Sequence, residues 1–391
     1  MTDTAVTPGS QSALRRANER RVVDVLRRQG TCTQAELARA TGLSAASVSN
    51  IVRGLRAAGT VSVRDTASNG RRARGVTLLR PPGTVLAIDF EADRLGIGIG
   101  DSEGNLVARE QIDYDVAADP GRGVRRAAWL AETTLQGARI DAGTVSAVVA
   151  SVPGPIDPAT GEVGPISCLP RWAGFRPAEA LAERLGAPVR AENDANLAAL
   201  AEQRLGAGAG AEHLIHLVIG EGVGAGIVLS GEPFPGAGGT AGEIGHIALD
   251  PRGPVCRCGN RGCLETFVGA RYLLGMLPQD FEVERGRGGP RMSDVVAAAR
   301  GGDPGSRRIV AEAGTALGQG AAIVANLFNP DRVTVGGPLA EAGELLLEPM
   351  RRSMELGSLG SALDRLTLSE GALGRDASLY GALWTAVRTA H

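Results

Sequence analysis

Apolar residues recur at a helical period over the first part of the chain. A helix over residues 11–29 is predicted to turn Leu14, Val22, Val23 and Leu26 toward one side. A stripe of this kind is buried when other elements pack against it. The segment is therefore expected to be the first helix of a small N-terminal domain.

Two shorter helices follow. Thr33-Gln34-Ala35-Glu36 has the S/T-x-x-E form, in which the hydroxyl and the carboxylate each accept a hydrogen bond from a free backbone N–H, and this helix should end near Thr41-Gly42. Ser44 can cap the next helix. The inward face of that helix is predicted from four apolar residues at i, i+3, i+4 and i+7, namely Val48, Ile51, Val52 and Leu55.

Residues 60–63 and 75–79 alternate like strands around a turn at 68–72. Two short helices joined by T-G-L-S and followed by a strand pair are typical of a winged helix-turn-helix, whose second helix enters the DNA major groove. Residues 1–80 are therefore predicted to form a DNA-binding domain, and the Pro-Pro-Gly segment 81–83 a short, stiff joint.

The rest of the chain is predicted to form an α/β body in which a strand-turn-strand pattern occurs twice. Strands are expected at 84–90, 95–100, 105–112 and 145–152, with a helix at about 123–137. A second hairpin is expected at 213–220 and 224–229, a long helix at 311–327, a strand at 332–337 and a last helix at 379–389. Two similar strand-turn-strand units suggest a duplicated fold with lobes at 84–200 and 201–391, the last helix packing back across both lobes.

Charge separates the two regions. Residues 1–80 hold 14 arginines and five acids, which leaves 27 basic and 38 acidic residues for the remainder, since the whole chain has 41 and 43. A basic head on an acidic body suggests a polyanionic partner for the head. The chain has no run of about 18 apolar residues and no apolar leader, so no membrane partner is expected, and we expect it in the cytoplasm.

DNA contacts are expected from the outer face of the second short helix and from the wing. The candidates are Ser44, Ala45, Ser49, Asn50, Arg53, Arg71, Arg72 and Arg74. Arginines on a wing beside a recognition helix contact phosphates or a minor groove. The alternative is that the wing arginines are solvated turn residues, and the helix residues could contact phosphate or water alone.

Three of the five cysteines lie close together after a histidine. His246, Cys256, Cys258 and Cys263 form a Cys₃His set within the loop 246–263, which suits one tetrahedral structural zinc ion per chain. Disulfides are disfavoured in the cytoplasm. The alternative is a turn that carries reduced cysteines. Cys32 is interpreted as a packing residue.

The motifs Gly242-Glu243-Ile244-Gly245-His246 and Cys256-x-Cys258-Gly-x-x-Gly-Cys263-x-Glu265 resemble those of the ROK family of repressors, open reading frames and sugar kinases. The resemblance covers nearly the whole chain, and only the repressor branch carries a winged head. Within that branch the chain is most similar to xylose-type regulators. The resemblance implies a two-lobed α/β body of the actin-like ATPase (ribonuclease-H-like) fold, with sugar in the cleft between the lobes.

The segment Glu192–Asn196 resembles the family's E-N-D-A-N segment, whose Asp is the base in kinases. The resemblance implies a sugar-binding set of Asn193, Asp194, Glu243, His246 and Glu265. His246 would then bind metal through one ring nitrogen and face the sugar through the other. From the residues alone, the acids at 192 and 194 could equally be a cluster that favours a helix N-terminus.

The chain departs from the kinase pattern at two phosphate turns. Glu91 and Asp93 stand where kinases have a D-x-G-G-T-type turn, and Glu221 stands in a turn similar to G-T-G-x-G-x-G. Carboxylates there would repel a triphosphate, and only Arg94 partly offsets this, so neither ATP binding nor a catalytic residue is expected. Cys168 also replaces an asparagine that contacts the sugar in the family.

These observations favour a sugar-responsive DNA-binding transcriptional regulator, a repressor of carbohydrate genes. Its expected partners are operator DNA, a monosaccharide or derivative, and further copies of the chain in a homodimer or homotetramer. One alternative is a sugar kinase with a fused DNA-binding head. Another is a degenerate body that binds a protein partner.

Overall fold

The computed structural model describes residues 18–390 apart from 20, 24, 27–28, 58–59, 69–70, 79–82, 280 and 282–288, and it leaves out the side chains at 65–68, 71–73 and 78. Two compact units are present, residues 1–83 and 84–391. We describe each by itself. Leu14, the side chains of Arg71 and Arg72, and residues 81–82 of the expected joint lie outside the described part.

The first unit has the winged helix-turn-helix architecture. Residues 18–29 are helical wherever they are described, and a sheet of order β1-β3-β2 has one strand before the next two helices and two strands after them. The elements are β1 (Cys32–Thr33), α2 (Gln34–Thr41), α3 (Ala45–Ala57), β2 (Val61–Ser68) and β3 (Arg71–Leu78). Val22, Leu26, Val48, Ile51 and Val52 are buried together, as the helical period predicts, and Leu55 packs against them half-buried.

Both predicted caps of this unit are present. Glu36 accepts a hydrogen bond from Thr33 N at 2.7 Å and Thr33 Oγ1 accepts one from Glu36 N at 3.3 Å, which closes the capping box. Ser44 Oγ accepts from Ser47 N at 3.2 Å at the start of α3. Cys32 is 3% exposed, which confirms its packing role.

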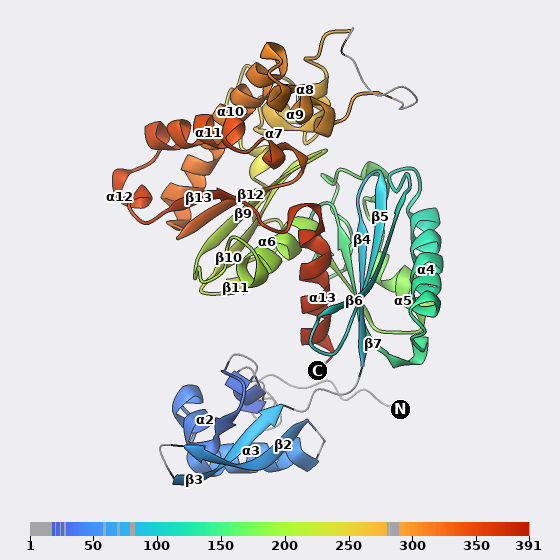
Figure 1. Cartoon of the computed structure of the whole chain (residues 1–391), viewed down its shortest axis with the longest axis vertical. Helices are drawn as coiled ribbons and strands as arrows, with labels where there is room; N and C mark the ends of the chain where they lie inside the picture. The colour runs from blue at the N-terminus through green and yellow to red at the C-terminus, as the bar shows by residue number, and fades with distance from the viewer. Residues whose placement is uncertain are drawn as a thin grey trace. The chain divides into compact units, whose positions relative to one another are not determined.

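The second unit contains two lobes built on the same sheet pattern (Figure 1). The first sheet has the order β6-β5-β4-β7-β8 and the second has the order β11-β10-β9-β12-β13. In each, a hairpin pairs antiparallel, a further strand pairs parallel to the inner strand of the hairpin, and a last strand pairs parallel to that one. The duplication predicted from the sequence is therefore present.

The first lobe consists of β4 (Thr84–Phe90), β5 (Arg94–Gly100), β6 (Leu106–Asp113), α4 (Pro120–Gly137), β7 (Val145–Val152), α5 (Pro177–Leu185) and β8 (Val189–Asn193). The second consists of β9 (Leu214–Ile219), β10 (Val223–Leu229), β11 (Glu232–Pro233), α7 (Glu265–Val268), α8 (Ala270–Leu274), α9 (Met292–Gly301), α10 (Pro304–Phe328), β12 (Arg332–Gly336), α11 (Glu344–Gly357), α12 (Gly360–Leu363) and β13 (Thr367–Glu370). Short 3₁₀ turns lie at 142–144, 170–172, 244–246, 338–342 and 374–376.

Two helices connect the lobes. Helix α6 (Asp194–Leu205) follows β8 of the first lobe and packs on β9 and β10 of the second, while α13 (Ala377–Thr389) follows the second lobe and packs on β4, β5 and β7 of the first. The two helices also pack against each other. The last helix thus returns to the first lobe, and the expected division at residue 200 falls inside α6.

Two helix starts were predicted too late. Helix α4 begins at Pro120 rather than near residue 123, because Asp119 caps it by accepting from Arg122 N at 2.7 Å. Helix α10 begins at Pro304 rather than at 311, because Asp303 accepts from Ser306 N at 2.7 Å. In both, proline occupies the first helical position, where its missing N–H costs nothing.

None of the helices in the part of the chain that the structure describes combines the length and apolar character needed to cross a bilayer.

Candidate functional site

A cavity of about 300 Å³ lies between the two lobes. Its walls include the turn after β4, the β8–α6 junction and the β9–β10 turn, so both lobes contribute. Acids from each lobe face it, among them Asp89, Asp194 and Glu243. A cavity of mixed character with a few convergent polar groups, at a junction of this kind, is a usual place for a ligand.

Asn193 and Asp194 are held at the junction by backbone contacts. The Asn193 side chain caps α6 by accepting from Asn196 N at 3.0 Å, and its amide donates to Gly154 O at 2.9 Å. Asp194 Oδ1 accepts from Ala195 N at 2.9 Å. The N-terminus of α6 therefore forms part of the cavity wall. A role in ligand binding and a role at the helix N-terminus are thus compatible for this segment.

Burial, and to a smaller extent the nearby Asp89 carboxylate, raise the pKa of Asp194 to about 7. The pKa of Glu243 is also raised to about 7, by burial first and then by Asp194. Near neutral pH these two carboxyl groups can therefore act as hydrogen-bond acceptors or donors, which is the property that sugar hydroxyls require.

The remaining two members of the expected sugar set, His246 and Glu265, do not line the cavity but contact residues that do. His246 Nε2 is 3.8 Å from Glu243 Oε2. Glu265 is 3% exposed, accepts from Val223 N at 3.3 Å and forms an ion pair with Arg257. The structure thus brings Asn193, Asp194 and Glu243 to the cavity and places the other two as their neighbours.

Sequence reasoning missed Arg257. Its guanidinium lines the cavity and donates to Cys168 Sγ at 3.4 Å, in addition to its ion pair with Glu265. Cys168 itself also lines the cavity, and burial raises the pKa of its thiol to about 11, so the thiol stays neutral. The only available signal was the position of Arg257 between two candidate metal ligands.

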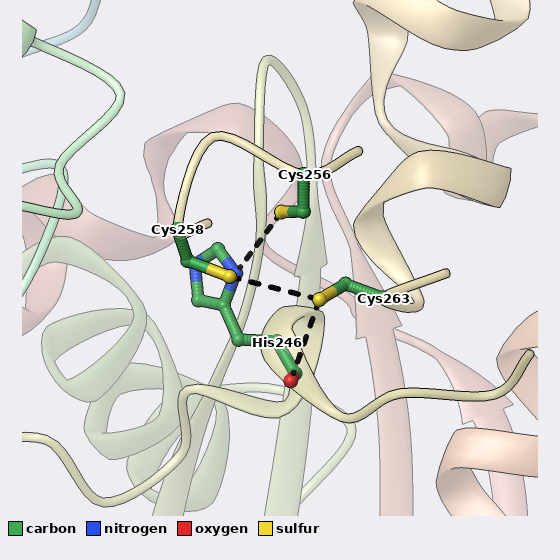
Figure 2. Close-up of side chains that lie close together, drawn as sticks. All are labelled: His246, Cys256, Cys258 and Cys263. Carbon is green, nitrogen blue, oxygen red and sulfur yellow. Dashed lines mark hydrogen bonds between the residues drawn. The ribbon is translucent and has the colours of Figure 1, made fainter. Parts of the chain in front are cut away.

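The four candidate metal ligands converge, as Figure 2 shows. Their donor atoms all lie within 4.8 Å of one another. His246 Nδ1 is 3.5 Å from Cys256 Sγ, and Cys258 Sγ is 3.6 Å from Cys263 Sγ. Three thiols and one imidazole in this arrangement fit a tetrahedral zinc ion with no open position.

The loop that carries these thiols is folded by its own backbone. Bridges join residue 248 to Cys263 and Val255 to Arg261, so the chain doubles back on itself. Gly262 has φ +60°, and a Cβ there would lie 1.6 Å from Asp250 O. Only glycine fits this turn, and without it Cys263 would not point at the other ligands.

The first phosphate-like turn differs from the expectation in its chemistry. Arg94 alone was expected to offset part of the negative charge of this turn, but Glu91 pairs both with Arg94 and, at 3.0 Å, with Arg375 Nη2. Its charge is therefore offset by two guanidinium groups. At Glu91 a phosphate would be excluded because the Arg375 side chain already fills the turn, and not because of charge repulsion. Asp93 in the same turn is exposed.

The second turn also carries an acid. Glu221 is exposed at the β9–β10 turn, and its pKa is raised by partial burial and then by the charge of Asp93. Asp93 and Glu221 both line the cavity, close enough for their charges to interact. Repulsion of a triphosphate remains the expected effect at this pair.

The expected DNA-contacting face of the first unit is accessible. Ser44, Ala45, Asn50 and Arg53 are exposed on or beside α3, Ser49 is half-buried, and Arg74 is exposed on β3. Asn50 and Arg53 lie opposite the buried stripe of α3. Arg71 and Arg72 belong to β3, but their side chains lie outside the described residues.

Comparison with known proteins agrees with this architecture. The model of the ROK family matches residues 85–389, which is most of the chain. The chain belongs to the ROK family. A model of the MarR family also matches residues 15–72, in the winged unit.

ROK relatives of two kinds are similar to the chain. A xylose repressor of Caldicellulosiruptor bescii is 27% identical over 387 residues, with 96% of both chains covered. A glucokinase of Thermotoga maritima is 30% identical over 309 residues, which cover 76% of this chain and 95% of the kinase. The repressor therefore shares the winged unit and the kinase only the body.

Solved structures divide in the same way. A ROK family transcriptional regulator described as a homologue of the Escherichia coli Mlc protein has a TM-score of 0.76, 27% identity and 96% coverage of both chains. A ROK glucokinase of Streptomyces griseus, in complex with glucose and AMPPNP, has a TM-score of 0.68 and 29% identity and covers 78% of this chain. The fold is thus that of ROK regulators, with a body shared by ROK kinases.

Proposed function

We propose that the protein is a sugar-responsive transcriptional regulator, a repressor of carbohydrate genes that acts in the cytoplasm on operator DNA. One observation carries the proposal: a body that keeps Asn193, Asp194 and Glu243 at its cavity, but has its phosphate turn filled by Arg375, is attached to a winged DNA-binding unit. A homodimer or homotetramer would present two heads to a pseudo-palindromic site.

In this proposal, sugar hydroxyls bind Asn193, Asp194 and Glu243, with His246 and Glu265 orienting the wall from behind. One zinc ion per chain, held by His246 and the three cysteines, stabilises the loop and fixes the His246 ring. The ring in turn faces Glu243 through its other nitrogen. The metal has a structural role only.

DNA binding and its response to sugar can be measured together. DNA selected from a random pool for binding to the full chain is labelled, and its affinity is followed by fluorescence anisotropy with and without each of a panel of monosaccharides. We expect one sugar to weaken binding, and Arg53→Ala to weaken it about tenfold without any sugar. Arg308→Ala, on the surface of α10, is the control.

DNA binding that no monosaccharide changes would contradict the sensing role. DNA binding that Arg53→Ala leaves unchanged would remove α3 as the contacting helix.

A sugar kinase with a DNA-binding head is the second candidate, because Asp194 occupies the position of the kinase base. Asp93 and Glu221 oppose it, since both would meet the nucleotide phosphates. ATP-dependent phosphorylation of any sugar in the panel would decide for the kinase. A third candidate, a body that binds only a protein, predicts that no sugar raises the melting temperature.

Cys168→Asn provides a test of the sugar wall. The amide restores a donor and an acceptor where the thiol now contacts Arg257 at 3.4 Å. We expect the affinity for a neutral hexose to rise about fivefold to tenfold, because one added hydrogen bond contributes about 1 kcal/mol. Isothermal titration calorimetry measures this, and Cys168→Ala, which adds no polar group, is the matched control. Equal affinities for the two variants would contradict this role for position 168.

A further inference from the structure

Residues 371–378 form the second connection between the lobes, which we call the crossing segment. It leaves β13 in the sheet of the second lobe and enters α13, which packs on the sheet of the first. Gly374, Arg375 and Ser378 also line the cavity between the lobes. Any change in how the lobes are arranged must therefore be accommodated here and at the β8–α6 junction.

The first half of the crossing segment is fixed to the second lobe. Gly371 N donates to Val335 O in β12 at 2.8 Å. The side chain of Glu202, fully buried on α6, accepts hydrogen bonds from Ala372 N at 3.1 Å and Leu373 N at 2.8 Å. A buried carboxylate that accepts from backbone N–H groups is a strong and directional anchor.

The second half is fixed to the first lobe through the occupied phosphate turn. Arg375 Nη2 is 3.0 Å from Glu91 Oε2, and Arg94 donates to Arg375 O at 3.3 Å. The acid that replaces a phosphate-binding residue thus holds the chain that joins the lobes.

Two further contacts hold the same half. Arg109 of β6 forms a two-point ion pair with Asp376, at 2.5 and 2.7 Å. Ser378 Oγ lies 3.0 Å from both carboxylate oxygens of Asp89, which is 4% exposed. Side chains from β4, β5 and β6 therefore all contribute to this attachment.

Gly374 is the residue between the two attachments. Its φ is +56°, in the region that L-residues with a side chain avoid, and a Cβ built there would meet no atom within 4 Å. A side chain at this position would therefore be disfavoured by the backbone conformation and not by packing. Gly374 also opens the 3₁₀ turn 374–376, where its C=O accepts a hydrogen bond from Ala377 N, so its φ and ψ are the torsions that lie between the two attachments.

We infer that Gly374 is the pivot about which the two lobes open and close, with Glu202 anchoring one side and Glu91 the other. The two lobes move against each other along the contact between helices α6 and α13. These helices pack closely, since a Cβ on Gly381 of α13 would lie 2.0 Å from Leu197 O of α6. Hinges of this kind consist of a few residues that absorb the torsional change.

The pivot explains how the proposed sugar response could work, and its role in that response rests on the proposed function. A ligand that contacts walls from both lobes binds the closed arrangement more tightly than the open one, and that difference is what can shift the equilibrium. Closure about Gly374 would move the crossing segment that begins α13. The pivot itself is a property of the free protein, so it can be tested without a sugar.

The test measures the distance between the lobes in the full, ligand-free chain. Dyes on unnatural amino acids at Gln136 of α4 and Glu355 of α11, both exposed, report it by single-molecule energy transfer. Gly374→Ala should change the ratio of lobe arrangements about tenfold, because alanine disfavours the left-handed conformation. Gly374→Asn should restore the ratio of the unsubstituted chain, since asparagine tolerates that conformation.

Gly186→Ala is the matched control, with φ +63°, equally open space and a position outside the crossing segment. It should leave the distance distribution unchanged. Distributions that are identical for Gly374→Ala and the unsubstituted chain would overturn the pivot. So would an equal change in Gly374→Ala and Gly374→Asn, because the effect would then not depend on the backbone conformation. Either result leaves the DNA-release assay, and with it the proposed function, standing.

Discussion

Replacing Cys263 by alanine should reduce the bound zinc from one ion per chain to a small fraction and lower the melting temperature of the body by about 10 °C. The thiol is fully buried and lies 3.6 Å from Cys258 Sγ. Without the metal, the backbone bridges of the loop remain, but the three polar donors that are left lose the ion they share. Metal analysis of the purified chain and differential scanning calorimetry give the two quantities.

Cys32→Ala is the control for the loss of a buried thiol. It removes the same atom from the core of the first unit, so it should destabilise that unit without changing the zinc content. A Cys263→Ala chain that keeps its zinc, or a metal-free unsubstituted chain with the same melting temperature, would contradict a structural zinc.

The zinc loop also reaches the cavity by two routes. His246 Nε2 lies 3.8 Å from Glu243, and Arg257, between two of the cysteines, contacts Cys168 and Glu265. Loss of zinc should therefore weaken sugar binding as well as the loop. The first unit has its own core and should keep its fold.

Local signals explain why the winged unit was predicted well. The capping box at Thr33 and Glu36 and the stripe in α3 depend on residues within one or two turns of each other. The late starts predicted for α4 and α10 have a local cause too. Asp119-Pro120 and Asp303-Pro304 are each a cap followed by proline, a start signal that precedes the apolar period.

The candidate site was predictable only in part. The four metal ligands could be found because their spacing within one loop is itself the signal. The contact of Glu91 with Arg375 could not, since Arg375 is 284 residues away and lies in no periodic or motif context. Family resemblance placed an acid in a phosphate turn, but only the fold shows that the acid is paired.

That pairing changes the physical argument against a nucleotide. A free Glu91 would repel a phosphate, and the repulsion would weaken at high salt. A paired Glu91 instead occupies the turn with Arg94 and Arg375, which are needed to join the lobes. Removing it would expose arginines but would also loosen the crossing segment, so Glu91→Gly alone is not expected to create a nucleotide site.

Asp194→Asn is expected to weaken the binding of the effector sugar about 100-fold and to make the protein more stable at pH 8. Affinity falls because a charged acceptor contributes about 1.5–3 kcal/mol per hydrogen bond and sugar hydroxyls are expected to make more than one. Stability rises because the carboxylate is costly in its site, where burial raises its pKa from 3.8 to about 7.

The sign of the pH dependence follows from that shift. Between about pH 4 and pH 7 the native state holds a proton at Asp194 that the unfolded state has lost, so the group's contribution to stability declines as the pH rises through this window. The asparagine variant lacks this decline. Denaturant melts at pH 5 and pH 8 should therefore show a small difference between the two proteins at pH 5 and a larger one at pH 8.

Asp364→Asn, at an exposed carboxylate near the end of α12, is the matched control and should change neither sugar affinity nor the pH dependence. Equal stability of Asp194→Asn and the unsubstituted chain at pH 8 would mean that Asp194 is solvated well enough to ionise freely. A sugar affinity unchanged by the substitution would place the ligand elsewhere than the β8–α6 junction. The two outcomes are independent, because one reports the environment of the carboxylate and the other its contact with the ligand.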